Sequence, residues 1–149
     1  MLSHKMGKHD YFTLPEFVNS STAKKKGIDN TPSFEVVEHL NELVDNFLDP
    51  LRAAYGMPIR ITSGYRCPEL NKAVGGSSTS VHMLGWACDM QVGGSFEKFK
   101  TFVVDWVKKN NIKFDQLLLE KNANGDKWIH IGLKNNAGQQ RCQIKVMEV

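Results

Sequence analysis

Two kinds of apolar segment are missing from this sequence of 149 residues. No stretch approaches about 18 consecutive apolar residues, which excludes a transmembrane helix and predicts no membrane partner. The first residues, MLSHKMGKHDYF, contain no apolar core of the signal-peptide type. We therefore expect synthesis and retention in the cytoplasm, unless another factor releases the protein to its site of action.

The cysteines and charges of the sequence do not form the patterns that define several protein classes. The three cysteines, Cys67, Cys88 and Cys142, are odd in number and lack CxxC spacing, which argues against a disulfide framework and a thiolate zinc cluster. We expect Cys88 to be a small buried hydrophobic residue. The net charge of +3 is mild, and aromatic and basic residues do not alternate as in single-strand binders, so no nucleic-acid partner is predicted.

Helical spacing of apolar residues is present in two long segments. In the first, Thr31 suits the N-cap and Pro32 suits the first helical position. Pro50 is expected to kink or split this helix, and Gly56 to end it. A second helix is expected to begin after Ser95 and to end at an Asn-Asn pair.

Alternating polar and apolar residues predict strands in PIRITSGY, ACDMQV, FDQLLLE and WIHIGL. The last two are joined by KNANGD, whose Asn-Gly pair signals a hairpin. The terminal QQRCQIKVMEV indicates a final strand or an extended tail. Strands and helices mix without a βαβ rhythm, so we expect one α+β domain over residues 1–149: a small antiparallel sheet with helices packed around it, preceded by a loose segment at 1–10.

Three residues carry the chemistry of a metal site. Two imidazoles, from His82 and His130, and the carboxylate of Asp89 form a standard ligand set for a catalytic zinc with one position left for water. Strand alternation sends His130 to the opposite face from Ile129 and Ile131. Each of the three residues taken alone is more often a hydrogen-bonded core group, and the HExxH motif of another class of zinc peptidase is absent.

The wider pattern is more specific. SGYR, a Gly-Gly loop, SVHMLGWACD and a late WIH occur in this order along the chain. This pattern resembles the zinc D-Ala-D-Ala carboxypeptidase family, whose fold is shared with the hedgehog signalling domain. FTLPEFVNSSTAKKKGIDNTP and LDPLRAAYGMPIRITSGYR resemble its small phage and prophage members. The resemblance implies that His82, Asp89 and His130 bind zinc, and that the substrates are stem peptides of bacterial peptidoglycan.

Two further residues lie in the matching motifs. Arg66 follows a strand and a tight Ser-Gly turn, where a guanidinium could grip a substrate carboxylate through two hydrogen bonds; the other interpretation is a surface ion pair. Ser80 either orients a ligand or substrate or simply caps its loop with its hydroxyl.

The general base is where the chain departs from the family pattern. Many relatives carry an acidic residue three positions before the last ligand, and here that position is Lys127. Asp115, Glu120 and Asp126 are the acids that remain nearby. If Glu120 pairs with Trp128 across the hairpin, its side chain shares the face of the metal ligands, so we predict Glu120 as the base and keep Asp126 as the alternative.

These features predict a monomeric zinc peptidase that hydrolyses an amide bond in peptidoglycan stem peptides. A D-Ala-D-Ala carboxypeptidase and an endolysin-type endopeptidase are both consistent with the sequence. The missing export signal suits, by analogy, a phage enzyme that reaches the cell wall after release at lysis or as part of a virion. A non-catalytic zinc-binding module that recognises cell-wall peptides is the alternative, since Lys127 occupies the usual acidic position.

Overall fold

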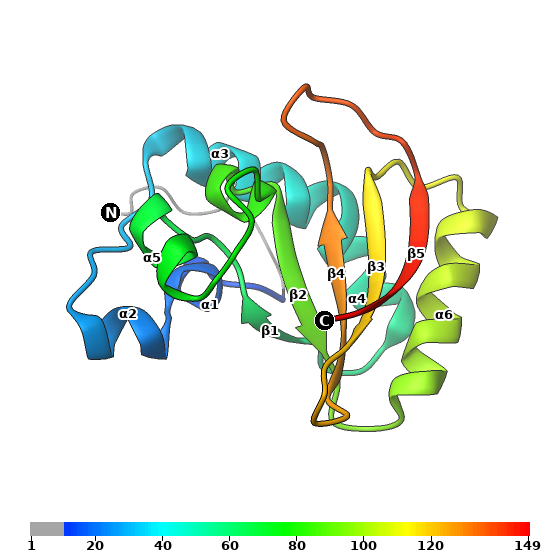
Figure 1. Ribbon diagram of the computed structural model, residues 1–149. Coiled ribbons are helices and arrows are strands. Elements are labelled where there is room, and N and C mark those ends of the chain that lie inside the picture. The colour runs from blue at the N-terminus through cyan, green and yellow to red at the C-terminus, as the bar shows by residue number, and fades with distance from the viewer. Residues whose placement is uncertain (1–10) are drawn as a thin grey trace.

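A computed structural model describes residues 11–149 (Figure 1). The expected loose segment at 1–10 lies outside the described residues. The architecture is α+β, as predicted, with a five-stranded sheet and helices around it. In chain order, the elements are α1 (Leu14–Val18), α2 (Ser21–Lys26), α3 (Phe34–Leu43), the π-helix η1 (Val44–Leu48), α4 (Asp49–Tyr55), β1 (Arg60–Ser63), α5 (Pro68–Ala73), the 3-10 helix η2 (Val81–Leu84), β2 (Ala87–Gln91), α6 (Phe96–Lys109), β3 (Gln116–Lys121), β4 (Lys127–Gly132) and β5 (Gln143–Glu148).

The strand order is β1-β2-β4-β3-β5, so β4 lies at the centre of the sheet. β3 and β4 form the predicted hairpin, in which Glu120 pairs with Trp128 and Leu118 with His130. β5 pairs with β3 in parallel, whereas all other pairs are antiparallel. The expectation of a purely antiparallel sheet is therefore wrong at this edge. The long connection between β4 and β5 carries the chain back along the sheet, so that β5 runs in the same direction as β3 (Figure 1).

The first long helix begins two residues later than predicted. Ser33, not Thr31, is the N-cap, and its hydroxyl accepts the backbone N–H of Val36 at 3.2 Å. Thr31 instead donates its backbone N–H and its hydroxyl to the Asp29 carboxylate, at 3.0 and 2.6 Å. An aspartate that binds the backbone two residues ahead forms a local turn, and this turn occupies the groups that a cap would need.

Pro50 divides the same helical segment, as expected. The five residues of η1, Val44–Leu48, precede it with π-helical spacing, and α4 then continues to the left-handed Gly56. Proline has no N–H and its ring collides with the carbonyl four residues earlier. A wider π turn just before the proline accommodates this ring while the chain continues in the same direction.

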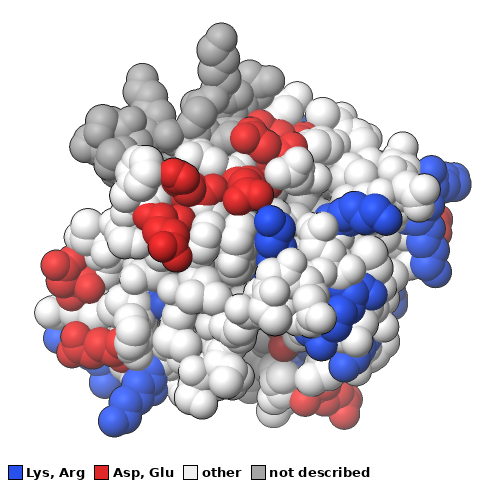
Figure 2. Space-filling view, turned by 90° about the horizontal axis from the view of Figure 1, so that it is seen from above, with Lys and Arg blue, Asp and Glu red and all other residues white. Residues whose placement is uncertain are grey.

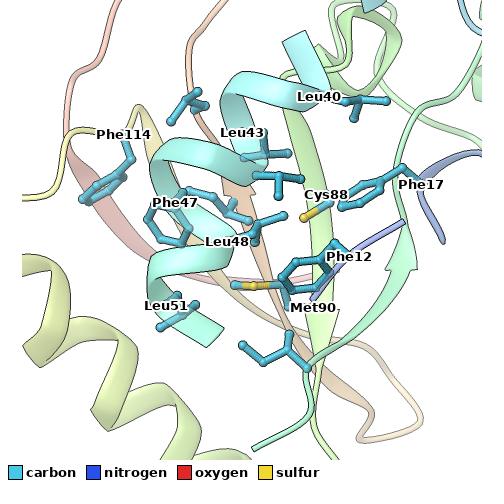
Figure 3. Close-up of a cluster of buried hydrophobic side chains, with 14 of the residues drawn as sticks. Phe12, Phe17, Leu40, Leu43, Phe47, Leu48, Leu51, Cys88, Met90 and Phe114 are labelled. Atoms are coloured by element: carbon cyan, nitrogen blue, oxygen red, sulfur yellow. The ribbon is translucent and has the colours of Figure 1, made fainter. Parts of the chain in front are cut away.

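The core lies between one face of the sheet and the α3–η1–α4 segment, with α6 beside it (Figures 1 and 3). Figure 3 shows Cys88 and Met90 of β2 directed toward Phe47 and Leu48 of this segment. Cys88 is fully buried and free, as predicted. The largest fully buried side chains come from these layers and from α1 and α5: Phe17, Phe47, Phe99, Leu40, Leu43, Leu48, Leu51, Leu70, Met90, Leu117, Ile129 and Ile131.

The other face of the sheet is not covered by this core. Ile129 and Ile131 are fully buried, so strand alternation turns His130 and the side chains paired with it toward this second face. Figure 2 shows both acidic and basic side chains on the face seen from above, which agrees with the mild net charge.

Within residues 11–149, no helix has the length and apolar character that a membrane crossing requires.

Candidate metal centre

The sheet brings two of the predicted ligands side by side. Asp89 on β2 and His130 on β4 are direct cross-strand partners. Their side chains share the uncovered face, and Nδ1 of His130 lies 3.1 Å from Oδ1 of Asp89. Cross-strand pairing therefore sets the distance between these two groups, and a shift of one residue in either strand would separate them.

The third predicted ligand, His82, lies in η2 just before β2. The Ser80 hydroxyl accepts the backbone N–H of His82 at 3.2 Å and caps this short helix. Gly85 ends it with a φ of 80°, and a Cβ at Gly85 would lie 2.7 Å from the carbonyl oxygen of Val36. Only glycine suits both the left-handed conformation and this close approach, so Gly85 fixes how the His82 helix packs against α3.

The hydrogen bond made by His82 determines which of its nitrogens is available. Nδ1 lies 2.7 Å from the carbonyl oxygen of Gly64. A carbonyl oxygen can only accept a hydrogen bond, so Nδ1 carries the hydrogen and Nε2 carries the lone pair. Nε2 lies 3.5 Å from Oδ1 of Asp89. In neutral His82 this geometry directs a lone pair at a carboxylate oxygen, which is repulsive unless a cation lies between them.

The three residues fit a divalent metal ion. One ligand atom from each of His82, Asp89 and His130 lies within 4.8 Å of the other two. Two imidazole nitrogens and one carboxylate oxygen are ligands that zinc prefers, and three protein ligands leave a position open for chemistry. The structure thus places the predicted residues together. A zinc ion bound between them would remove the repulsion between the His82 lone pair and the Asp89 carboxylate.

The charges around this centre favour the metal-binding protonation states. Burial lowers the pKa of His82, which keeps its imidazole neutral. Burial alone would raise the pKa of Asp89, but the hydrogen bond with His130 and the electrostatic interaction with the two imidazoles outweigh it, so the pKa of Asp89 lies well below its usual value. A neutral imidazole and an ionised carboxylate are the forms that coordinate zinc.

Glu120 projects into the same pocket as the triad. Its Oε1 accepts the indole N–H of Trp128 at 2.8 Å, across the hairpin pair that the sequence predicts. Burial raises the pKa of Glu120, and the negative charge of Asp89 raises it further. A carboxylate with a raised pKa is a better proton acceptor than a free one. The sequence pattern predicted that Trp128 lies on this face, but it did not predict the hydrogen bond between Trp128 and Glu120.

Arg66 and Ser80 also line this pocket, which has a volume of about 580 Å³. Nη2 of Arg66 lies 3.4 Å from the Ser80 hydroxyl, and the Nε of Arg66 is buried without a hydrogen-bond partner. Burial lowers the pKa of Arg66, although the charges of Asp89 and Glu120 oppose this. Arg66 therefore has no carboxylate within ion-pair distance among the described residues, contrary to the surface ion-pair interpretation, and it has donors to offer a ligand.

The two other acids have different surroundings. Asp126 lies in the hairpin turn, where it accepts the side-chain amide of Asn122 at 3.2 Å, and its residue is exposed. Asp115 is buried, and its two oxygens bind Nε and Nη2 of Arg141 at 2.7 and 2.8 Å. Arg141 also lines the pocket. Sequence reasoning missed Arg141 because it precedes β5, whose pairing was not predicted.

Comparison with known proteins agrees with this geometry. A family model described as Peptidase M15 matches residues 10–132. The match includes all three candidate metal ligands, together with Arg66, Ser80 and Glu120, and it ends before Arg141. No curated protein matches the chain significantly.

Proposed function

The chain belongs to the peptidase M15 family, and from this membership and the site geometry we propose that it is a zinc-dependent peptidase acting on peptidoglycan stem peptides. One observation carries the proposal: a His-Asp-His ligand set and a carboxylate held by an indole N–H line one pocket. The set supplies three ligands, and the carboxylate supplies the proton acceptor that hydrolysis of an amide requires.

Each residue has a distinct task in this proposal. His82, Asp89 and His130 would hold a zinc ion, which would supply a Lewis acid for the scissile carbonyl and the attacking water. Glu120 accepts a proton from that water and delivers it to the leaving amine. Because Oε1 of Glu120 already binds Trp128, Oε2 is the oxygen that takes the proton. Arg66 lines the pocket and holds a carboxylate of the substrate through N–H groups of its guanidinium.

The surroundings of Lys127 favour an enzyme over a non-catalytic binding module. The ammonium of Lys127 lies 3.4 Å from the Glu97 carboxylate of α6, and Lys127 does not line the pocket. The residue that suggested a missing base therefore lies outside the site, and Glu120 occupies the position from which a base can act. The expected setting is cell-wall hydrolysis after release at phage lysis or as part of a virion.

Purified sacculi test this proposal directly. The zinc-loaded protein should release new amino groups from them, whereas protein stripped of metal and the Glu120→Gln variant should not. Mass spectrometry of the digested muropeptides then identifies the bond. Loss of a terminal D-Ala indicates a carboxypeptidase, and a cut inside the stem indicates an endopeptidase. Binding to sacculi without any new amino groups would instead support the non-catalytic module.

A further inference from the structure

A second arginine lines the pocket on the side away from Glu120. Arg141 stands just before β5, and its guanidinium binds the Asp115 carboxylate through Nε and Nη2. Asp115 is buried, with 3% of its surface exposed, whereas 41% of the Arg141 side chain is exposed. A bidentate pair of this kind fixes both the position and the plane of the guanidinium.

The sheet register places this pair relative to the metal centre. His130 pairs with Leu118 on β3, and Asp115 lies three residues before Leu118. At about 3.3 Å per residue, Asp115 is roughly 10 Å along the strand from the His130 row. Glu120 lies two residues beyond Leu118 in the opposite direction. The pocket therefore extends from Glu120, past the metal ligands, to Arg141. At about 3.3 Å per residue its length along β3 is roughly 17 Å, which fits about five residues of an extended peptide, about three of them between the metal ligands and Arg141.

Arg141 retains donors for a ligand after it has paired with Asp115. A guanidinium has five N–H groups, and the contacts with Asp115 use two of them. Gln116, Asn135 and Asn136 also line the pocket. Each of their side-chain amides donates one N–H to another residue and keeps a second N–H. Polar donors grouped around a fixed guanidinium suit a planar anion better than an apolar side chain.

The start of β5 also makes hydrogen bonds that do not involve the Arg141 guanidinium. The backbone N–H of Arg141 binds Oδ1 of Asp115 at 3.2 Å, and Cys142 and Gln143 donate to the carbonyl oxygens of Phe114 and Asp115 at 2.9 Å each. These three bonds join the two segments without the guanidinium. A purely structural role would not require a partly exposed arginine that lines the pocket.

We propose that the Asp115–Arg141 end of the pocket is a binding subsite for a second carboxylate of the substrate, one to three residues from the scissile bond. The inference rests on the proposed function, which makes the ligand a peptide. Stem peptides contain such groups, since a γ-linked D-glutamate leaves its α-carboxylate free and a diaminopimelate carries a carboxylate on its side chain. Arg66 and Arg141 then bind two different carboxylates on either side of the metal centre.

Matched pairs of synthetic stem pentapeptides test the subsite. One pair carries D-isoglutamate or D-isoglutamine, and the other carries diaminopimelate or its side-chain amide. For at least one pair, the acid should have a kcat/KM roughly 10- to 100-fold above that of the amide, the range expected for hydrogen bonds to a charged group. Arg141→Gln should abolish this ratio, while Lys108→Gln, which removes an exposed charge of α6, should preserve it.

Calorimetric binding of the same peptides to the Glu120→Gln variant provides a readout that does not depend on cleavage. If no peptide is cleaved, the proposed function fails, and the affinity ratio of acid to amide still decides the subsite. The inference would be overturned if acids and amides had equal kcat/KM with the native protein and equal affinity for the Glu120→Gln variant, which keeps Arg141. So would an Arg141→Gln variant that loses the same factor on every peptide, since that pattern marks a structural ion pair.

Discussion

The contact between Trp128 and Glu120 leads to a sharp test of the proposed base. Trp128→Phe removes the indole N–H but keeps an aromatic ring in the same strand position. In the native protein that N–H lies 2.8 Å from Oε1 of Glu120 and holds the carboxylate on the metal side of the hairpin. Without it, the carboxylate can rotate about its side-chain torsions, and fewer molecules present Oε2 to the attacking water.

The expected magnitude follows from the strength of that single bond. A hydrogen bond to a charged acceptor contributes about 1.5–3 kcal/mol, so Trp128→Phe should lower kcat by roughly 10- to 100-fold. Glu120→Gln removes the proton acceptor itself and should lower turnover by roughly 10²–10⁴-fold. KM should change little in either variant, because Arg66 and the metal centre, not Glu120, are proposed to bind the substrate.

A double-mutant cycle separates this role from a structural one. If Trp128 acts through Glu120, adding Trp128→Phe to Glu120→Gln should cause no further loss. Zinc content should stay at one ion per chain in all three variants. The indole N–H signal of Trp128 in a nitrogen-correlated NMR spectrum, identified by its loss in the Phe variant, should also move in Glu120→Gln. Additive losses, or an unmoved indole signal, would refute the reasoning.

Four other changes have expected outcomes. His130→Ala should remove most of the bound zinc and abolish the rise in melting temperature that zinc causes, because a ligand that binds only the folded state stabilises it; full zinc retention would exclude this site. Arg66→Ala should lower kcat/KM more than melting temperature, and a large drop in melting temperature with normal specific activity would make Arg66 structural. Asp126→Asn should leave turnover nearly unchanged, since its side chain contacts only the turn; an inactive variant would move the base to the turn. Hydrogen bonds from Arg141 lower the pKa of Asp115, so the unfolding free energy should fall as pH drops below the usual aspartate pKa, and denaturant titrations should show a smaller fall for Asp115→Asn.

Local patterns in the sequence were sufficient to predict much of the site. Alternation in WIHIGL predicts the face of His130, and the Asn-Gly turn signal predicts the hairpin. The register was assumed, with Glu120 opposite Trp128, and the structure has this pairing. Ser95 caps α6 as expected. These features depend on residues close together in the chain, for which strand alternation and turn chemistry are strong constraints.

Features that depend on distant segments were not predictable in the same way. The parallel pairing of β5 with β3 depends on the path of a long connection, which has no periodic pattern to reveal its direction. The position of Arg141 in the pocket follows from that pairing. The displaced N-cap at Ser33 has a local cause, the turn formed by Asp29, but two hydroxyl residues two positions apart compete for one cap and sequence alone does not rank them.

The position of Lys127 illustrates how strand geometry decides which residue can be the base. Along β4, residues that share a face are separated by an even number of positions, so Trp128 shares the face of His130 and Lys127 does not. The ion pair of Lys127 with Glu97 agrees with this, because α6 lies away from the pocket. In this structure the Lys127 side chain therefore points away from the metal ligands. The neighbouring strand supplies the alternative: Glu120 pairs with Trp128, shares its face and enters the pocket beside the triad.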